Sequence, residues 1–151
     1  MDQSVIDLII DGLTKHSELS YRRPNANELK IFGTPIQGFD ITLYIGIREN
    51  MLIFDQFHWH YDNTEEEIDE MLNKITYALF GYIRIKEFFN NKQPYKWVLQ
   101  VQDQKGNWYD DQTMGKINTF LGKPDNRYLQ NMILTKDTEN NSYSLPNEDK
   151  T

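Results

Sequence analysis

The sequence predicts an α+β fold, with a mainly antiparallel sheet of about five or six strands and an N-terminal helix and a central amphipathic helix packed on one face. Three observations predict it. Apolar and polar residues alternate along several segments, which is typical of antiparallel strands with one solvated face. Two other segments repeat apolar residues at helical spacing. The 151 residues, 38% hydrophobic and 26% charged, suit one globular domain.

Capping residues and apolar stripes predict the two helices. The first runs from Ser4 to Leu13, with Ser4 as its N-cap. The second begins after Thr64, with Glu67 three residues later as the partner in a capping box. Gly81 stands where a left-handed residue commonly ends a helix. The apolar stripe of this second helix consists of Ile68, Met71, Leu72, Ile75, Ala78 and Leu79.

Period-two alternation predicts the strands. In chain order they cover residues 28–32, 39–47, 51–61, 82–89 and 94–102, with a last strand at 128–134. A three-residue loop at 48–50, with Asn50 in the left-handed conformation, would pair Ile41 with Phe57.

The remaining segments are less regular. We expect an irregular connection at 15–27, the start of a further strand at 108–109 and a short helix at 112–121. The folded domain is expected to cover residues 1–134, and the polar residues 135–151 to form a mobile tail.

Charge and composition exclude several classes of function. The net charge of −7 argues against nucleic acid as a partner, because such binding neutralises phosphates with Lys and Arg. Apolar runs are too short to span a membrane, and the N-terminus carries acid where a signal peptide carries base, so we expect a cytoplasmic protein. The absence of cysteine excludes thiolate metal sites and cysteine nucleophiles. No phosphate-binding glycine loop occurs, and no cofactor is expected.

The pentapeptide HWHYD, residues 58–62, is the candidate for chemistry. Alternation along a strand places His58, His60 and Asp62 on one face, and all three are competent zinc ligands. The spacing resembles the metal motif of metallo-β-lactamase-like hydrolases, which implies a metal-dependent hydrolase that uses these three residues. Asn63 stands where that motif has a further histidine, and the third histidine is His16. The alternative is that the aromatic residues of this strand fill the core and the polar ones face solvent.

A run of acid follows directly. Residues 62–70 contain six carboxylates and no basic residue. Capping and a solvated helix face explain part of this run, and a surface for a basic partner explains it as a whole. The residues expected to contact such a partner are Asp62, Glu65, Glu66, Asp69 and Glu70. Basic residues at 84, 86 and 96 could instead pair with this acid in a homodimer.

These features favour a non-catalytic protein-binding module over an enzyme. A small, acidic, cysteine-free α+β chain looks like the bacterial immunity proteins, which neutralise a toxin by covering its active site. The predicted order of helix, three strands, helix and two strands is also similar to that of acidic, dimeric secretion chaperones. A third hypothesis is a ligand-binding domain whose pocket is lined by Trp59, Trp97 or Tyr82.

Overall fold

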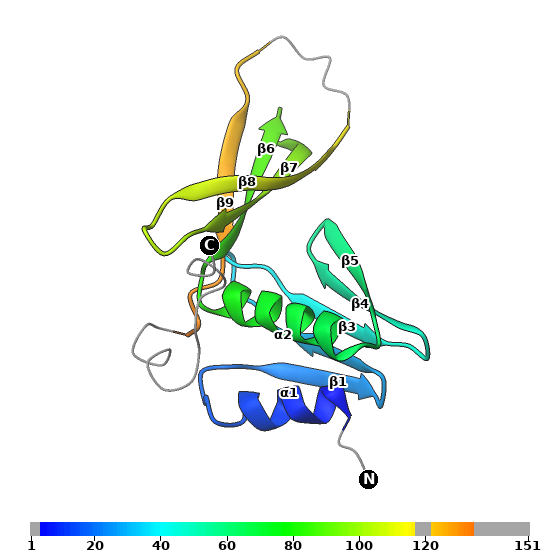
Figure 1. Ribbon diagram of the computed structural model, residues 1–151. Coiled ribbons are helices and arrows are strands. Elements are labelled where there is room, and N and C mark those ends of the chain that lie inside the picture. Colours follow the sequence, from blue (N-terminus) through cyan, green and yellow to red (C-terminus); the bar gives the residue numbers. More distant parts are fainter. Residues whose placement is uncertain (1–3, 117–121, 135–151) are drawn as a thin grey trace.

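The α+β prediction is confirmed by the computed structural model, which describes residues 4–116 and 122–134 (Figure 1). These residues form two helices and nine strands in two antiparallel sheets, more strands than expected. The elements are α1 (Val5–Leu13), β1 (Tyr21–Asn25), β2 (Glu28–Ile31), β3 (Ile41–Ile45), β4 (Glu49–Phe54), β5 (Phe57–Asp62), α2 (Glu65–Leu79), β6 (Ile83–Asn90), β7 (Gln93–Gln102), β8 (Trp108–Gly115) and β9 (Asp125–Gln130).

The first sheet is a meander in the order β1-β2-β3-β4-β5. Strands β2, β3 and β4 alternate between buried and more exposed residues, so one face of the sheet is apolar. Cross-strand partners line up in rows along that face, and each row spans four strands. One row consists of Ile31, Ile41, Phe54 and Phe57, and the next of Leu29, Leu43, Leu52 and Trp59.

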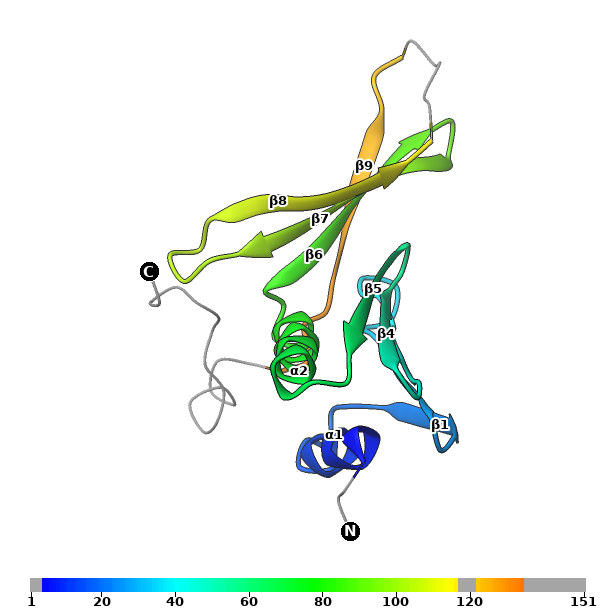
Figure 2. The same cartoon turned by 45° about the vertical axis from the view of Figure 1, so that its right-hand side comes forward.

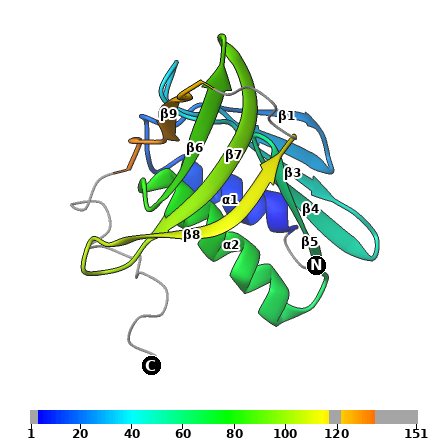
Figure 3. The same cartoon turned by 90° about the horizontal axis from the view of Figure 1, so that it is seen from above.

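The second sheet has the order β8-β7-β6-β9, so β9 returns to the edge beside β6. Figure 2 shows both helices on the same side of the first sheet, with α2 between α1 and the second sheet. Seen from above, β6, β7 and β8 cross over the helices (Figure 3). Buried residues of both helices and both sheets form one hydrophobic cluster. α2 is therefore the element around which the rest is packed.

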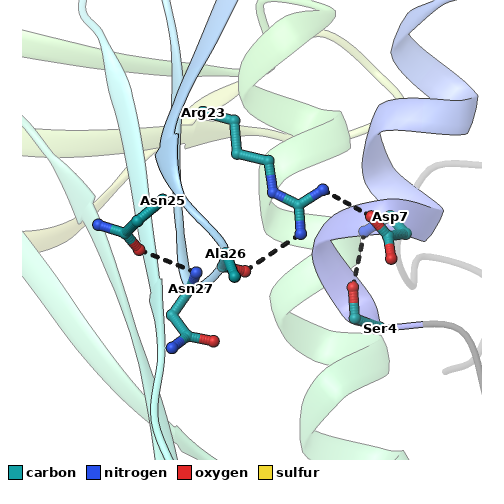
Figure 4. Close-up of polar contacts among 6 residues, drawn as sticks. All are labelled: Ser4, Asp7, Arg23, Asn25, Ala26 and Asn27. Atoms are coloured by element: carbon teal, nitrogen blue, oxygen red, sulfur yellow. Dashed lines mark hydrogen bonds and ion pairs between the residues drawn. The ribbon is translucent and has the colours of Figure 1, made fainter.

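Polar contacts hold α1 against the first hairpin (Figure 4). Ser4 caps the helix by accepting a hydrogen bond from the Asp7 amide at 3.1 Å. The Arg23 guanidinium donates to Asp7 Oδ1 at 2.6 Å and to the Ala26 carbonyl at 3.1 Å. Arg23 therefore joins α1 to the β1–β2 turn.

A buried asparagine fastens the segment after β9 to the loop before β3. Asn131 is fully buried. Its Oδ1 accepts hydrogen bonds from the amides of Thr34 at 3.0 Å and Phe39 at 3.1 Å, and its Nδ2 donates to the Phe39 carbonyl at 3.0 Å. We call this set of hydrogen bonds the Asn131 clasp. It connects residues more than 90 positions apart in the chain.

The prediction of a single strand at 51–61 is wrong. The chain reverses after Phe54, at Asp55, which adopts a positive φ of 55°. The segment therefore forms β4 and β5 as a hairpin. Ile41 pairs with Phe54 and not with Phe57.

Two loop predictions also fail. Residues 15–27, expected to be irregular, include strand β1. Asn50 belongs to β4 and is fully buried, where its Nδ2 donates to Asn63 Oδ1 at 2.6 Å. The actual loop lies earlier, so Ile47, expected in the core, is 97% exposed.

The chain after α2 is only partly as predicted. The hairpin of β6 and β7 is confirmed, with positive φ at both Asn91 and Lys92 in its turn. Residues 112–115, expected to be helical, pair with β7 as part of β8. The last strand lies at 125–130 and not at 128–134. The rest of the expected helix, at 117–121, and the tail at 135–151 lie outside the described residues.

Candidate functional site

The start of α2 is fixed by Thr64 and Glu67. Thr64 Oγ1 accepts a hydrogen bond from the Glu67 amide at 3.3 Å, as the capping box predicts. The Glu67 carboxylate reaches further back than predicted and accepts from the Asp62 amide at 2.8 Å. Glu67 therefore has a structural role, and it orients the junction between β5 and the helix.

The five predicted contact residues come together at this junction and along the first turns of α2. Each is exposed, and none forms an ion pair with another described residue. We call them the acidic surface: Asp62, Glu65, Glu66, Asp69 and Glu70. Glu49 extends it, because it lies directly opposite Asp62 across the β4–β5 ladder.

The histidines lie on the outer face of β5. His58 and His60 are both exposed, with ring centroids 5.5 Å apart. His60 Nδ1 lies 3.2 Å from Glu49 Oε1. Within residues 4–116 and 122–134, no three His, Asp or Glu side chains lie close enough to hold a metal ion. His58, His60 and Asp62 lie on one face of β5, but Asp62 is not close enough to the two histidines to complete a set of three metal ligands.

A groove opens beside the acidic surface, between α2, β5 and the second sheet. Its volume is about 570 Å³. Its walls include Trp59 and Tyr61 from β5, Glu70 and Lys74 from α2, and Asp111 from β8. A smaller cavity of about 180 Å³ between the two helices is lined mainly by apolar side chains, with His16 as its single ionisable one. The larger groove is the one of these two that has carboxylates and a lysine in its walls.

The ammonium group of a lysine in α2 occupies part of the groove. Lys74 Nζ lies over the Trp59 ring, 4.2 Å from its centroid. Burial lowers the pKa of Lys74, while the carboxylates of Asp111 and Glu70 act in the opposite direction. Burial, together with the charges of Glu70, Asp111 and Glu67, raises the pKa of Tyr61 to about 12. Both shifts reflect a partly desolvated groove, whereas the negative charge of the carboxylates adds to the Tyr61 shift and opposes the Lys74 shift.

Trp59, suggested as a pocket residue by the sequence, lines this groove. Its indole Nε1 is buried and has no hydrogen-bond partner among the described residues. Trp97 lines a different depression, and Tyr82 is buried in the core. Lys74 and Asp111 were not among the predicted site residues.

The second sheet carries the opposite charge on one face. Arg84 lies between two aromatic rings, 4.0 Å from the Trp108 centroid and 4.1 Å from the Tyr128 centroid, and it donates to Gln100 at 2.7 Å. Lys86 also lies over an aromatic ring, 5.1 Å from the Phe88 centroid. These cations already have partners in the chain, unlike the carboxylates of the acidic surface.

Glu87, a buried carboxylate of β6, has both oxygens occupied. It accepts from Trp97 Nε1 at 2.8 Å and from Arg127 Nε at 2.7 Å. Nearby, burial and the Glu87 charge raise the pKa of Asp55 at the tip of the β4–β5 hairpin. The hydrogen bonds of Glu87 connect three strands of the second sheet, which is a structural role.

Comparison of the chain with protein-family models, with curated proteins and with solved structures finds no match. No helix in the described part of the chain is both long and apolar enough to cross a lipid bilayer.

Proposed function

We propose that this protein is a non-catalytic protein-binding module that binds a basic partner through the acidic surface, and that it acts as an immunity-type inhibitor of a toxin. The observation that carries this proposal is the set of five exposed carboxylates without an ion pair among the described residues. Such a surface accelerates association with a basic protein and favours it over other partners.

Helix stability alone does not account for the acidic surface. A negative first turn favours the helix dipole, which explains Glu65 and Glu66. Asp69 and Glu70 lie beyond that turn and form like-charge pairs at i, i+4 with Glu65 and Glu66, and such pairs destabilise a helix. A basic partner would relieve this repulsion.

Two other functions receive less support. A metal-dependent hydrolase needs a further ligand beside His58 and His60, and the described residues offer no such group. The secretion-chaperone hypothesis relied on three strands between the helices and two after the second one, whereas residues 4–116 and 122–134 form five and four.

The experiment is affinity capture with tagged protein from cells of the source organism, comparing the wild type with Glu66→Lys/Asp69→Lys. Glu70 is left intact because it also lines the groove. We expect the wild type to capture a basic protein and the variant to lose it. The matched control is Glu18→Lys/Asp125→Lys, which makes the same change in net charge at exposed positions away from α2.

Inhibition is tested with the captured protein. Co-expression with the wild type should restore growth to cells that produce the partner, whereas co-expression with Glu66→Lys/Asp69→Lys should not. Equal capture by the wild type and that variant would contradict binding through the acidic surface. A partner that is harmless to cells would contradict the immunity-type role and leave a binding module of another kind.

A further inference from the structure

The groove beside the acidic surface is lined by two kinds of group that attract cations, carboxylates and an aromatic ring. Its α2 wall contributes Glu70 and its β8 wall contributes Asp111, so carboxylates line both sides. The Trp59 ring, which also lines the groove, offers a face that attracts positive charge. Lys74 already lies over that face, with its ammonium 4.2 Å from the ring centroid.

Lys74 fills the groove incompletely. Its ammonium contacts the Trp59 ring but lies within 4.0 Å of no carboxylate among the described residues. Glu70 and Asp111 therefore keep their hydrogen-bonding capacity, and the groove keeps a volume of about 570 Å³. A lysine has a flexible stem and can move aside at low cost in free energy.

We propose that this groove receives an arginine side chain of the basic partner, which displaces Lys74 from the Trp59 ring and lies between Glu70 and Asp111. This inference rests on the proposed function, because that function supplies the basic partner. Arginine fits better than lysine for two reasons. Its planar guanidinium stacks on an indole and is weakly hydrated, so it enters a partly buried groove more easily. Its five donors can serve two carboxylates at once.

The test is a titration of the full-length protein, followed through the tryptophan indole NMR signals. The chain has three tryptophans, and Trp59→Phe identifies the signal of Trp59. The probe is N-acetyl-arginine amide, and its neutral isostere N-acetyl-citrulline amide is the control. We expect the arginine probe to shift the Trp59 signal saturably and the citrulline probe to leave it unchanged.

Variants then assign the binding to the groove. Glu70→Gln/Asp111→Asn should weaken arginine binding about tenfold or more, the effect expected from losing charge-assisted hydrogen bonds. Lys74→Met removes the competing cation and should strengthen binding. Glu18→Gln/Asp125→Asn is the matched control, because it removes the same charge at exposed positions outside both the groove lining and the acidic surface and should leave the titration unchanged.

Three results would overturn the arginine site: no saturable shift of the Trp59 signal, an equal shift with citrulline, or an equal loss in the Glu18→Gln/Asp125→Asn control. The two proposals fail separately. Loss of capture in Glu66→Lys/Asp69→Lys without an arginine-dependent shift supports the acidic surface and overturns the groove. An arginine-dependent shift with unchanged capture supports the groove as a cation site and overturns binding through the acidic surface.

Discussion

Asn131 joins two distant segments of the chain through the hydrogen bonds of its side chain. Its side chain replaces the hydrogen bonds that the Thr34 and Phe39 backbones would otherwise make to water. Two glycines make room for it. A Cβ at Gly33 would lie 2.7 Å from Asn131 Oδ1, and one at Gly38 would lie 2.6 Å from the Thr34 amide. The loop from residue 33 to 39 is therefore built around this amide group.

Asn131→Ala should lower the free energy of unfolding by about 3 kcal/mol, because it leaves buried backbone groups without partners. Urea denaturation measures this. Asn126→Ala is the control, since Asn126 is exposed in the neighbouring strand, and its effect should stay within about 0.5 kcal/mol. Equal losses in the two variants would contradict a special role for the Asn131 clasp.

The Asp7 carboxyl makes the stability of the folded state depend on pH. Its hydrogen bond from Arg23, followed by that from Ser4, lowers the pKa of the Asp7 carboxyl below its usual value. Ionised Asp7 therefore stabilises the folded state above the pKa of the unfolded chain, and this contribution is lost as the pH falls through the lower, folded-state pKa.

Arg23→Gln should raise the pKa of Asp7 towards its ordinary value and weaken the contact between α1 and the first hairpin. A carboxyl carbon NMR titration of Asp7 measures the change. Arg22→Gln is the control, because Arg22 is exposed and neighbours the same site in sequence. An unchanged titration in Arg23→Gln would mean that Ser4 alone sets this pKa.

Local sequence explains which site residues could be predicted. The exposure of His58, His60 and the acidic surface follows from strand alternation and helix capping, which involve near neighbours. Asp111 could not be placed, because β8 is exposed along nearly its whole length and lacks the apolar alternation that identifies a strand. The groove, which Asp111 completes, was therefore not predictable as a charged site.

At the scale of elements, two glycines play opposite roles. Gly12 lies inside α1, and a Cβ there would meet nothing within 4 Å. Gly81 follows α2 with a φ of 81°, and a Cβ there would lie 2.8 Å from the Asn131 carbonyl oxygen. Gly12 thus costs helix stability, whereas Gly81 is required to end its helix.

The same substitution should therefore have opposite effects at the two positions. Gly12→Ala should raise the free energy of unfolding by about 0.5–1 kcal/mol through helix propensity. Gly81→Ala should lower it by more than about 1 kcal/mol, because alanine is strained at positive φ and meets backbone there. Thermal unfolding of the two variants side by side measures the difference. A loss of stability in both would indicate that α1 needs Gly12 for a reason other than helix geometry.

Elements with strong local signals could be predicted from the sequence. The residues at which individual strands begin and end could not. α2 was expected from its cap, stripe and terminal glycine, and all three features are present. The β4–β5 turn was missed because Asp55 carries no glycine or Asn-Gly signal, and the alternation of apolar residues continues across it. The register of β3 with β4 was mispredicted for a different reason, because the loop between these strands lies earlier than residues 48–50.

At the scale of the whole molecule, the two sheets share one core. Leu52 in the first sheet and Leu99 in the second are both fully buried in the same cluster. Leu52→Ala and Leu99→Ala should each lower the free energy of unfolding by about 3 kcal/mol. In each variant, amide NMR signals from β3 and from β7 should disappear at one common urea concentration. Separate midpoints for the two strands would show that the sheets unfold independently.

The Asn131 clasp also has a consequence for the order in which the chain folds during synthesis. A ribosome releases the N-terminal part first, and domains begin to fold in that order. All five strands of the first sheet leave the ribosome before Asn131 is made, so the amide of Thr34 and both backbone groups of Phe39 must wait for their partner. During synthesis there is therefore a stage at which every residue of the first sheet has been made but the loop at 33–39 still lacks its hydrogen bonds to Asn131. Chaperones and proteases can reach the loop at that stage.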